Sequence, residues 1–127
     1  MQNLLIKPNA NIKTALKQLS KEGEKCLVVV DNKNKLLGTL SDGDVRKAIL
    51  KGKFHNEKIN EFYHKNSIFL RKGNYSLAQA KNIFIKKRID IMPILKESGK
   101  TVVDVLTFEN IFKKVKRDQR YRTYSKT

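Results

Sequence analysis

Residues 26–31 read CLVVVD and residues 35–41 read KLLGTLS, and these two stretches decide the fold. Both are rich in β-branched and other apolar residues, and only the polar residues 32–34 separate them, so they predict a β-hairpin. Residues 12–19 before the hairpin carry apolar side chains at helical spacing, and residues 43–50 after it predict a second helix. The unit is therefore helix, strand, strand, helix.

The same order of elements returns in the second half of the chain. A helical pattern at 77–84 precedes two apolar stretches, 92–97 (MPILKE) and 101–107 (TVVDVLT), which a short polar turn joins into a second predicted hairpin. A helix is expected after it, over 109–115. The chain therefore contains an internal repeat, in which both halves have the same order of elements.

Each repeat begins with a short extended piece, at 4–6 and at 68–70. Residues 52–66 connect the repeats, with a short helix expected at 57–62. A half of about 60 residues buries too little surface to be stable alone. We therefore predict an α/β chain of the α+β type, in which the two repeats pack face to face about a pseudo-twofold axis.

These patterns divide the chain into a first repeat at 1–60, a second repeat at 61–114, and a basic tail or linker at 115–127. The longest clean apolar run spans only 27–30, which excludes a transmembrane helix. No secretory signal is expected from the N-terminal residues. Cys26 is the only cysteine, which fits a reducing compartment, so we expect a soluble protein of the cytoplasm.

The charge of the chain suggests an anionic partner. The 127 residues include 28 Lys and Arg against 12 Asp and Glu, a formal net charge of +16. Residues 113–127 hold seven basic residues and one acidic residue, and the rest of the excess is spread along the chain without a nucleic-acid-binding motif. A phosphate-bearing small molecule benefits from the same field. Nucleic-acid binding is therefore kept as the second hypothesis.

The sequence offers little machinery for catalysis. It contains no HExxH, GxSxG, Walker A or paired-cysteine motif, and no metal ligand set. His55 and His64 lie in the polar connection, where a solvated role is expected, and Cys26 opens an apolar strand as a small buried side chain. We expect no catalytic and no metal-binding residue here, while the parent protein can still be an enzyme.

One polar group of residues stands at the junction of the first hairpin and its following helix. Ser41 can donate a hydroxyl to a phosphate bound at the helix N-terminus, and Arg46 supplies a guanidinium nearby. Asp44 is an acceptor suited to the two hydroxyls of a ribose. The spacing of Ser41 and Asp44 also fits a capping box, which would only start a helix. The residues alone leave both interpretations open.

The repeated helix–hairpin–helix, the sequence VVD at 29–31 and the sequence LSDGDV at 40–45 resemble a tandem pair of CBS domains, also called a Bateman module. The resemblance covers residues 4–114. It implies that Ser41 and Asp44 bind the phosphate and the ribose of an adenine nucleotide (AMP, ADP or ATP). It also implies that the base lies against the backbone at Lys25, Cys26 and Leu27.

The second repeat departs from this pattern. Asp104 stands where the first repeat has Gly38, and Asn110 replaces the ribose-binding acid, whereas Thr107 keeps its hydroxyl. Asn110 lacks the charge that strengthens a hydrogen bond to a diol, and Asp104 adds negative charge near any phosphate. We expect one good nucleotide site and one that is weak or empty.

Residues 38–52 further resemble CBS pairs attached to sugar-phosphate enzymes. The resemblance implies a regulatory module, the N-terminal part of a sugar-1-phosphate nucleotidyltransferase or, alternatively, the CBS pair of a sugar-phosphate isomerase. Its expected partners are an adenosine nucleotide, an attached or partner catalytic domain, and a second copy in a homodimer. No membrane partner is expected, nucleic acid remains the less favoured second hypothesis, and a purely dimerising scaffold is the third.

Overall fold

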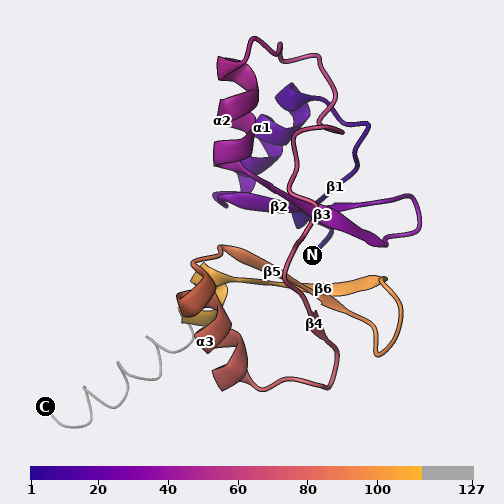
Figure 1. Ribbon diagram of the computed structural model, residues 1–127, viewed down its shortest axis with the longest axis vertical. Coiled ribbons are helices and arrows are strands. Elements are labelled where there is room, and N and C mark those ends of the chain that lie inside the picture. Colours follow the sequence, from indigo (N-terminus) through magenta and orange to yellow (C-terminus); the bar gives the residue numbers. More distant parts are fainter. Residues whose placement is uncertain (113–127) are drawn as a thin grey trace, which may run out of the picture.

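The predicted hairpin at 26–41 forms the centre of the first of two three-stranded sheets. In the computed structural model, which describes residues 1–112, strands β2 (Cys26–Val30) and β3 (Leu36–Ser41) pair antiparallel, and β1 (Leu5–Ile6) lies parallel to β2 (Figure 1). All five residues of β2 are buried, so this central strand faces packed side chains on both sides.

The second sheet repeats this arrangement. Strand β4 (Leu70–Arg71) lies parallel to β5 (Ile91–Leu95), which pairs antiparallel with β6 (Val102–Thr107). The register shifts before the last residue of β5, as it does before the last residue of β2. The internal repeat predicted from the sequence is confirmed down to this irregularity.

The helices lie outside the two sheets. Helix η1 (Gln2–Leu4) precedes β1, helices α1 (Ile12–Glu22) and α2 (Asp42–Leu50) flank the first hairpin, and α3 (Leu77–Lys87) precedes the second. Residues 108–112 are helical as well. Figure 1 shows α1 and α2 on the outer side of one sheet and α3 on the outer side of the other, with the sheets facing each other. The predicted fold class is confirmed.

The predicted remainder of the last helix and the tail at 115–127 lie outside the described residues. Among the residues that are described, no helix has the length and apolar character needed to cross a membrane.

The core is shared between the repeats. Ile91 and Leu95 of β5 and Val102 and Val105 of β6 belong to the same buried cluster as the first repeat's strands and helices. A smaller cluster beneath α3 contains Ala80, Phe84, Met92 and Ile111. Because much of the second hairpin is buried against the first repeat, neither half keeps its core intact without the other.

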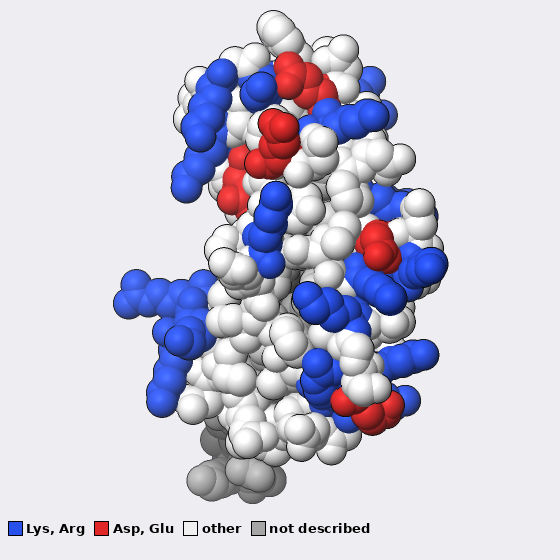
Figure 2. All heavy atoms as spheres, turned by 45° about the vertical axis from the view of Figure 1, so that its right-hand side comes forward, with Lys and Arg blue, Asp and Glu red and all other residues white. Residues whose placement is uncertain are grey.

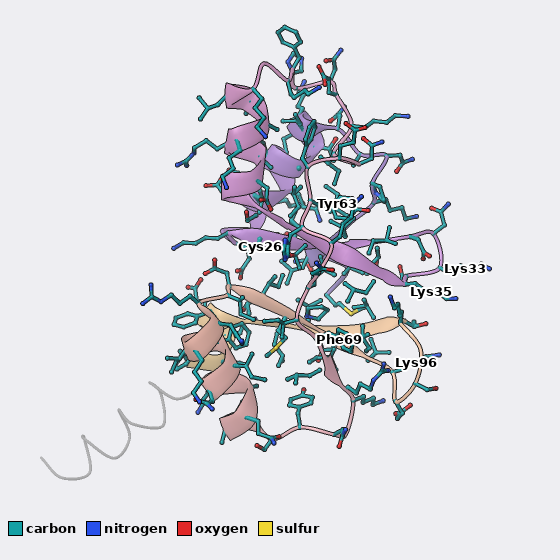
Figure 3. The ribbon with its side chains drawn as sticks, in the orientation of Figure 1. Cys26, Lys33, Lys35, Tyr63, Phe69 and Lys96 are labelled. Atoms are coloured by element: carbon teal, nitrogen blue, oxygen red, sulfur yellow. The ribbon has the colours of Figure 1, made fainter. Side chains whose placement is uncertain are left out.

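The tips of the two hairpins are joined by backbone hydrogen bonds. The Leu36 amide donates to the Lys100 carbonyl at 2.8 Å, and the Val102 amide donates to the Asn34 carbonyl at 2.9 Å. Figure 3 labels Lys33, Lys35 and Lys96 at this end of the molecule.

The connection between the repeats contains no helix at 57–62, where one was predicted. Its backbone is instead hydrogen-bonded to the start of α1: the Ile59 amide donates to the Ala10 carbonyl, and the Ile12 amide donates to the Glu57 carbonyl, both at 2.9 Å. Ile59 is fully buried. The connection therefore uses its backbone groups and its apolar side chain to cover the first repeat, which overrides local helix preference.

The same connection then crosses β3 at Gly38. The amide and carbonyl of His64 pair with the carbonyl and amide of Thr39 at 2.8 and 2.9 Å. A Cβ atom at Gly38 would overlap the His64 carbonyl and would lie 2.8 Å from the Tyr63 ring. Gly38 is thus required by this close approach, and Figure 3 shows Tyr63 on the segment that passes β3.

Candidate ligand pocket between the repeats

Ser41 ends β3 and caps α2. Its extended backbone (φ −92°, ψ 161°) places Oγ to accept a hydrogen bond from the Asp44 amide at 3.0 Å. The Asp44 Oδ2 atom accepts one from the Ser41 amide at 2.9 Å. The capping box is therefore present. It uses one carboxylate oxygen of Asp44, whereas Oδ1 is not part of it, so a cap and a ligand contact are compatible.

Ser41 and Asp44 line a cavity of about 290 Å³. Its wall comes from three parts of the chain: the first repeat, the connection and the second repeat. The lining residues are Cys26, Thr39, Ser41, Asp44, His64, Asn66, Ser67, Ile68, Arg88, Ile89, Asp90 and Ile91. A molecule in this cavity would touch both repeats, and we refer to it as the Ser41 pocket.

Five polar or charged residues that line the Ser41 pocket were not predicted as site residues, namely Thr39, Asn66, Ser67, Arg88 and Asp90, and His64, expected to be solvated, lines it as well. The Ser67 Oγ atom is buried and has no hydrogen-bond partner among the described residues. Arg88 follows the last turn of α3 in the left-handed conformation, with φ of 51°. The corresponding residue after α1 is Gly23, with φ of 63°. The repeat alignment was the one signal in the sequence that singles out Arg88, since it places arginine where glycine is preferred.

Two carboxylates make the electrostatic potential more negative at the wall of the Ser41 pocket that Cys26 forms. Burial is the main cause that raises the pKa of the Cys26 thiol to about 12, and the charges of Asp44 and Asp90 raise it further. Both carboxylates therefore act on the same wall of the Ser41 pocket. The thiol stays protonated at neutral pH, which is unsuited to a nucleophile.

The remaining residues of the predicted site are placed differently. The Lys25 carbonyl accepts a hydrogen bond from the Asp42 amide at 2.8 Å, and Leu27 is fully buried. Neither residue is part of the lining of the Ser41 pocket, although Cys26 between them is. The Arg46 side chain is 72% exposed and pairs with Asp42 at 3.3 Å, outside the pocket lining.

A second cavity of about 310 Å³ lies between the residues that follow α1 and the start of the last helix. Its lining comprises Gly23, Glu24, Lys25, Asp90, Phe108, Glu109 and Phe112. The Phe108 amide donates to the Asp90 carbonyl at 2.9 Å, which reproduces the bond between Asp42 and Lys25. The Phe108 and Phe112 rings lie 4.4 Å apart.

The predicted residues of the second repeat form a helix cap. Thr107 is fully buried, and its Oγ1 atom accepts a hydrogen bond from the Asn110 amide at 3.1 Å. The Asn110 side chain is exposed, and neither residue lines the second cavity. Among residues 1–112, no group of three or more His, Cys, Asp or Glu side chains could hold a metal ion.

Residues 2–51 match the family model of the CBS domain. Inosine-5'-monophosphate dehydrogenase of Aquifex aeolicus is 30% identical over 111 residues, which are 87% of this chain and 22% of that protein. Arabinose 5-phosphate isomerase GutQ of Escherichia coli is 28% identical over 91 residues, which are 72% of this chain and 28% of that protein. The chain spans less than a third of either relative.

Solved structures share the fold over most of the chain. A putative acetoin utilization protein (AcuB) from Vibrio cholerae has a TM-score of 0.81 at 16% identity, covering 95% of this chain and 87% of that one. CBSX2 in complex with AMP has a TM-score of 0.75 at 22% identity, covering 93% and 91%. The CBS domain pair of protein MJ0100, in complex with 5-methylthioadenosine and S-adenosyl-L-methionine, has a TM-score of 0.76 at 23% identity, covering 91% and 89%.

Proposed function

We propose that this chain, which has the fold of a CBS domain pair, is a regulatory module that binds an adenosine nucleotide in the Ser41 pocket. One observation carries the proposal: the cavity that Ser41 and Asp44 line is also lined by residues of the second repeat. CBSX2 and protein MJ0100, which share the fold, hold adenosine compounds in their solved structures.

The groups of the pocket suit such a ligand. The amides at the start of α2 and the Ser41 hydroxyl are donors for a phosphate, and the free oxygen of Asp44 can accept from the ribose hydroxyls. The backbone beside Cys26 is left for the base. On this proposal, Lys25, Leu27, Arg46, Thr107 and Asn110 contribute less to binding than the sequence suggested.

Regulation follows from the position of the pocket. A ligand that contacts both repeats favours the arrangement of the repeats that it fits best, and the population shifts toward that arrangement. Coupling between such sites is typically about 1–3 kcal/mol, or roughly 5–150-fold in affinity. An attached or partner catalytic domain that distinguishes the arrangements is then controlled by the nucleotide. We propose that this control operates in the cytoplasm. We also propose that the first repeat spans 1–60 and the second spans 61–114.

The controlled enzyme is proposed to act on a sugar phosphate. The nucleotidyltransferase hypothesis rests on the sequence at 38–52 alone, whereas the similarity to arabinose 5-phosphate isomerase favours the isomerase alternative. Determining the full reading frame beyond Thr127 tests both.

Nucleic-acid binding is the weaker candidate. Figure 2 shows Lys and Arg over both halves of the visible face, with acidic side chains between them, rather than in one continuous patch. A nucleic-acid surface would bind polymer with a steep dependence on salt, whereas the proposed nucleotide binding should survive moderate salt.

Calorimetric titration with AMP and ATP tests the proposed function. Asp44→Ala should weaken binding of the preferred nucleotide at least about tenfold, because charge-assisted hydrogen bonds contribute about 1.5–3 kcal/mol each. Asp44→Asn keeps an oxygen acceptor for the capping box but removes the carboxylate charge. It therefore separates the effect of the charge on binding from the effect of the cap on folding. Asn110→Ala is the matched control in the second repeat and should change the affinity little.

A thermal melt of each variant runs beside the titration. If Asp44→Ala lowers the melting temperature and the wild-type protein binds neither nucleotide at millimolar concentration, the capping box alone explains Asp44. The proposed function would then be wrong.

A further inference from the structure

We infer that the Ser41 pocket selects an adenosine ligand that carries at most one phosphate group, and that Arg88 binds that phosphate. This inference rests on the proposed function and deepens it by naming the ligand class.

The charges that line the Ser41 pocket favour a ligand with a single phosphate. Among the described residues of its lining, Arg88 supplies the one permanent positive charge, whereas Asp44 and Asp90 supply two negative charges. One phosphate can pair with the Arg88 guanidinium and the amides at the start of α2. Each further phosphate adds negative charge between two carboxylates and meets no additional cation in the lining, so it is repelled.

Asp90 is held beside the Ser41 pocket by its backbone. Its carbonyl accepts the Phe108 amide at 2.9 Å, and it directly precedes β5, so its backbone is fixed by the second repeat. The raised pKa of the Cys26 thiol has Asp44 and Asp90 among its causes, which places the field of both carboxylates on the same wall. Asp90 is exposed, but it lines the Ser41 pocket, so its negative charge acts on a ligand bound there.

The backbone of Arg88 is left-handed. A left-handed residue other than glycine costs of order 1–2 kcal/mol, and the first repeat avoids this cost with Gly23. No acidic side chain within residues 1–112 forms an ion pair with Arg88. Arg88 is an exposed residue that lines the Ser41 pocket, and a left-handed backbone at a residue other than glycine is found often at ligand sites.

Arg46 is the residue that makes this assignment testable. It is the arginine that the sequence nominated, but its side chain lies 72% exposed and paired with Asp42. Arg88→Gln and Arg46→Gln remove the same charge from the same protein, one inside the pocket lining and one outside it. Asp90→Asn and Glu97→Gln form the corresponding pair for a carboxylate, since Glu97 is exposed on the β5–β6 turn.

The experiment is calorimetric titration of the full chain with AMP, ATP and 5'-methylthioadenosine, which carries no phosphate. Wild-type protein should bind AMP at least about tenfold more tightly than ATP. Arg88→Gln should weaken AMP about tenfold and leave 5'-methylthioadenosine unchanged, whereas Arg46→Gln should change neither. Asp90→Asn should reduce the preference for AMP over ATP, and Glu97→Gln should not.

The possible failures are distinguishable. If ATP binds as tightly as AMP, or if Arg88→Gln leaves AMP binding intact while Arg46→Gln weakens it, the inference is overturned and the proposed function stands. If none of the three compounds binds, the proposed function fails and the inference fails with it. Arg88→Gly, which relieves the backbone conformation, guards against loss of folding: it should melt no lower than wild type and still bind AMP weakly.

Discussion

Gly38 is the residue at which the connection passes closest to β3. In β6 its counterpart, Asp104, is exposed and carries a side chain. Replacing Gly38 by alanine would bring a Cβ atom into the His64 carbonyl. The two residues are therefore not interchangeable, although they occupy the same place in the repeat.

Gly38→Ala should lower the free energy of unfolding by about 1–3 kcal/mol, the usual cost of overpacking. Urea unfolding measures the change. Gly43→Ala is the matched control, because its Cβ would meet nothing closer than 3.7 Å within α2 and alanine is the better helix residue there. Equal effects of the two substitutions would contradict the assigned role of the crossing.

Cys26 reports on the same pocket through its reactivity. Its thiol pKa rises from 9.0 to about 12 on folding. At pH 8 the native thiol should react with a disulfide reagent far more slowly than the unfolded chain does, since the thiolate is the reactive form. Asp44→Asn and Asp90→Asn should each speed the reaction, because each removes a charge that raises this pKa.

The raised pKa of the Cys26 thiol also makes the stability of the protein depend on pH. Since the folded pKa of Cys26 is raised, its contribution to stability is complete below pH 9 and is lost as the pH rises toward 12. Native labelling as fast as labelling in urea would show that Cys26 is not buried.

At the scale of elements, the connection is part of the first repeat's packing. Ile59→Ala should therefore cost about 2–5 kcal/mol of unfolding free energy, as for other buried isoleucines. Phe54→Ala, five residues earlier and 69% exposed, should cost little. Urea unfolding of both variants checks the prediction, and a similar small effect of each would mean that the connection is peripheral.

The elements that were predicted correctly are those with local signals. The hairpins follow from apolar stretches around short polar turns, and α2 and α3 begin at Ser41 and Ser76, each with a capping box. The connection at 57–62 was mispredicted because its conformation is set by backbone bonds to Ala10 and Ile12, which lie far away in the sequence.

The residues of the candidate site were also predicted correctly only where a local signal was present. Ser41 and Asp44 were found because they lie only three positions apart and one helix start holds both. Arg46 was nominated by proximity in sequence, but proximity does not say which side of α2 a side chain occupies. Arg88 reaches the pocket through the pairing of two repeats, which local pattern cannot specify.

At the scale of the whole molecule, the exposed apolar side chains of the outer helices predict a homodimer. Leu50 is 80% exposed and Ile85 is 59% exposed. Sedimentation at moderate salt should show a dimer, and Leu50→Lys or Ile85→Lys should weaken it, because the chain already carries +16. Only 14.7 kDa species at high protein concentration would contradict this prediction.

The backbone bridge between Leu36 and Lys100 lies at one end of β3, and Ser41 lies at the other, roughly 17 Å away. Backbone hydrogen bonds thus link the two repeats at this end of the sheets, while the Ser41 pocket lies toward the other end. We expect a ligand in the pocket to change the angle between the two sheets about the linked end, where their separation is fixed. An attached domain that contacts both repeats would then respond to that angle without touching the ligand.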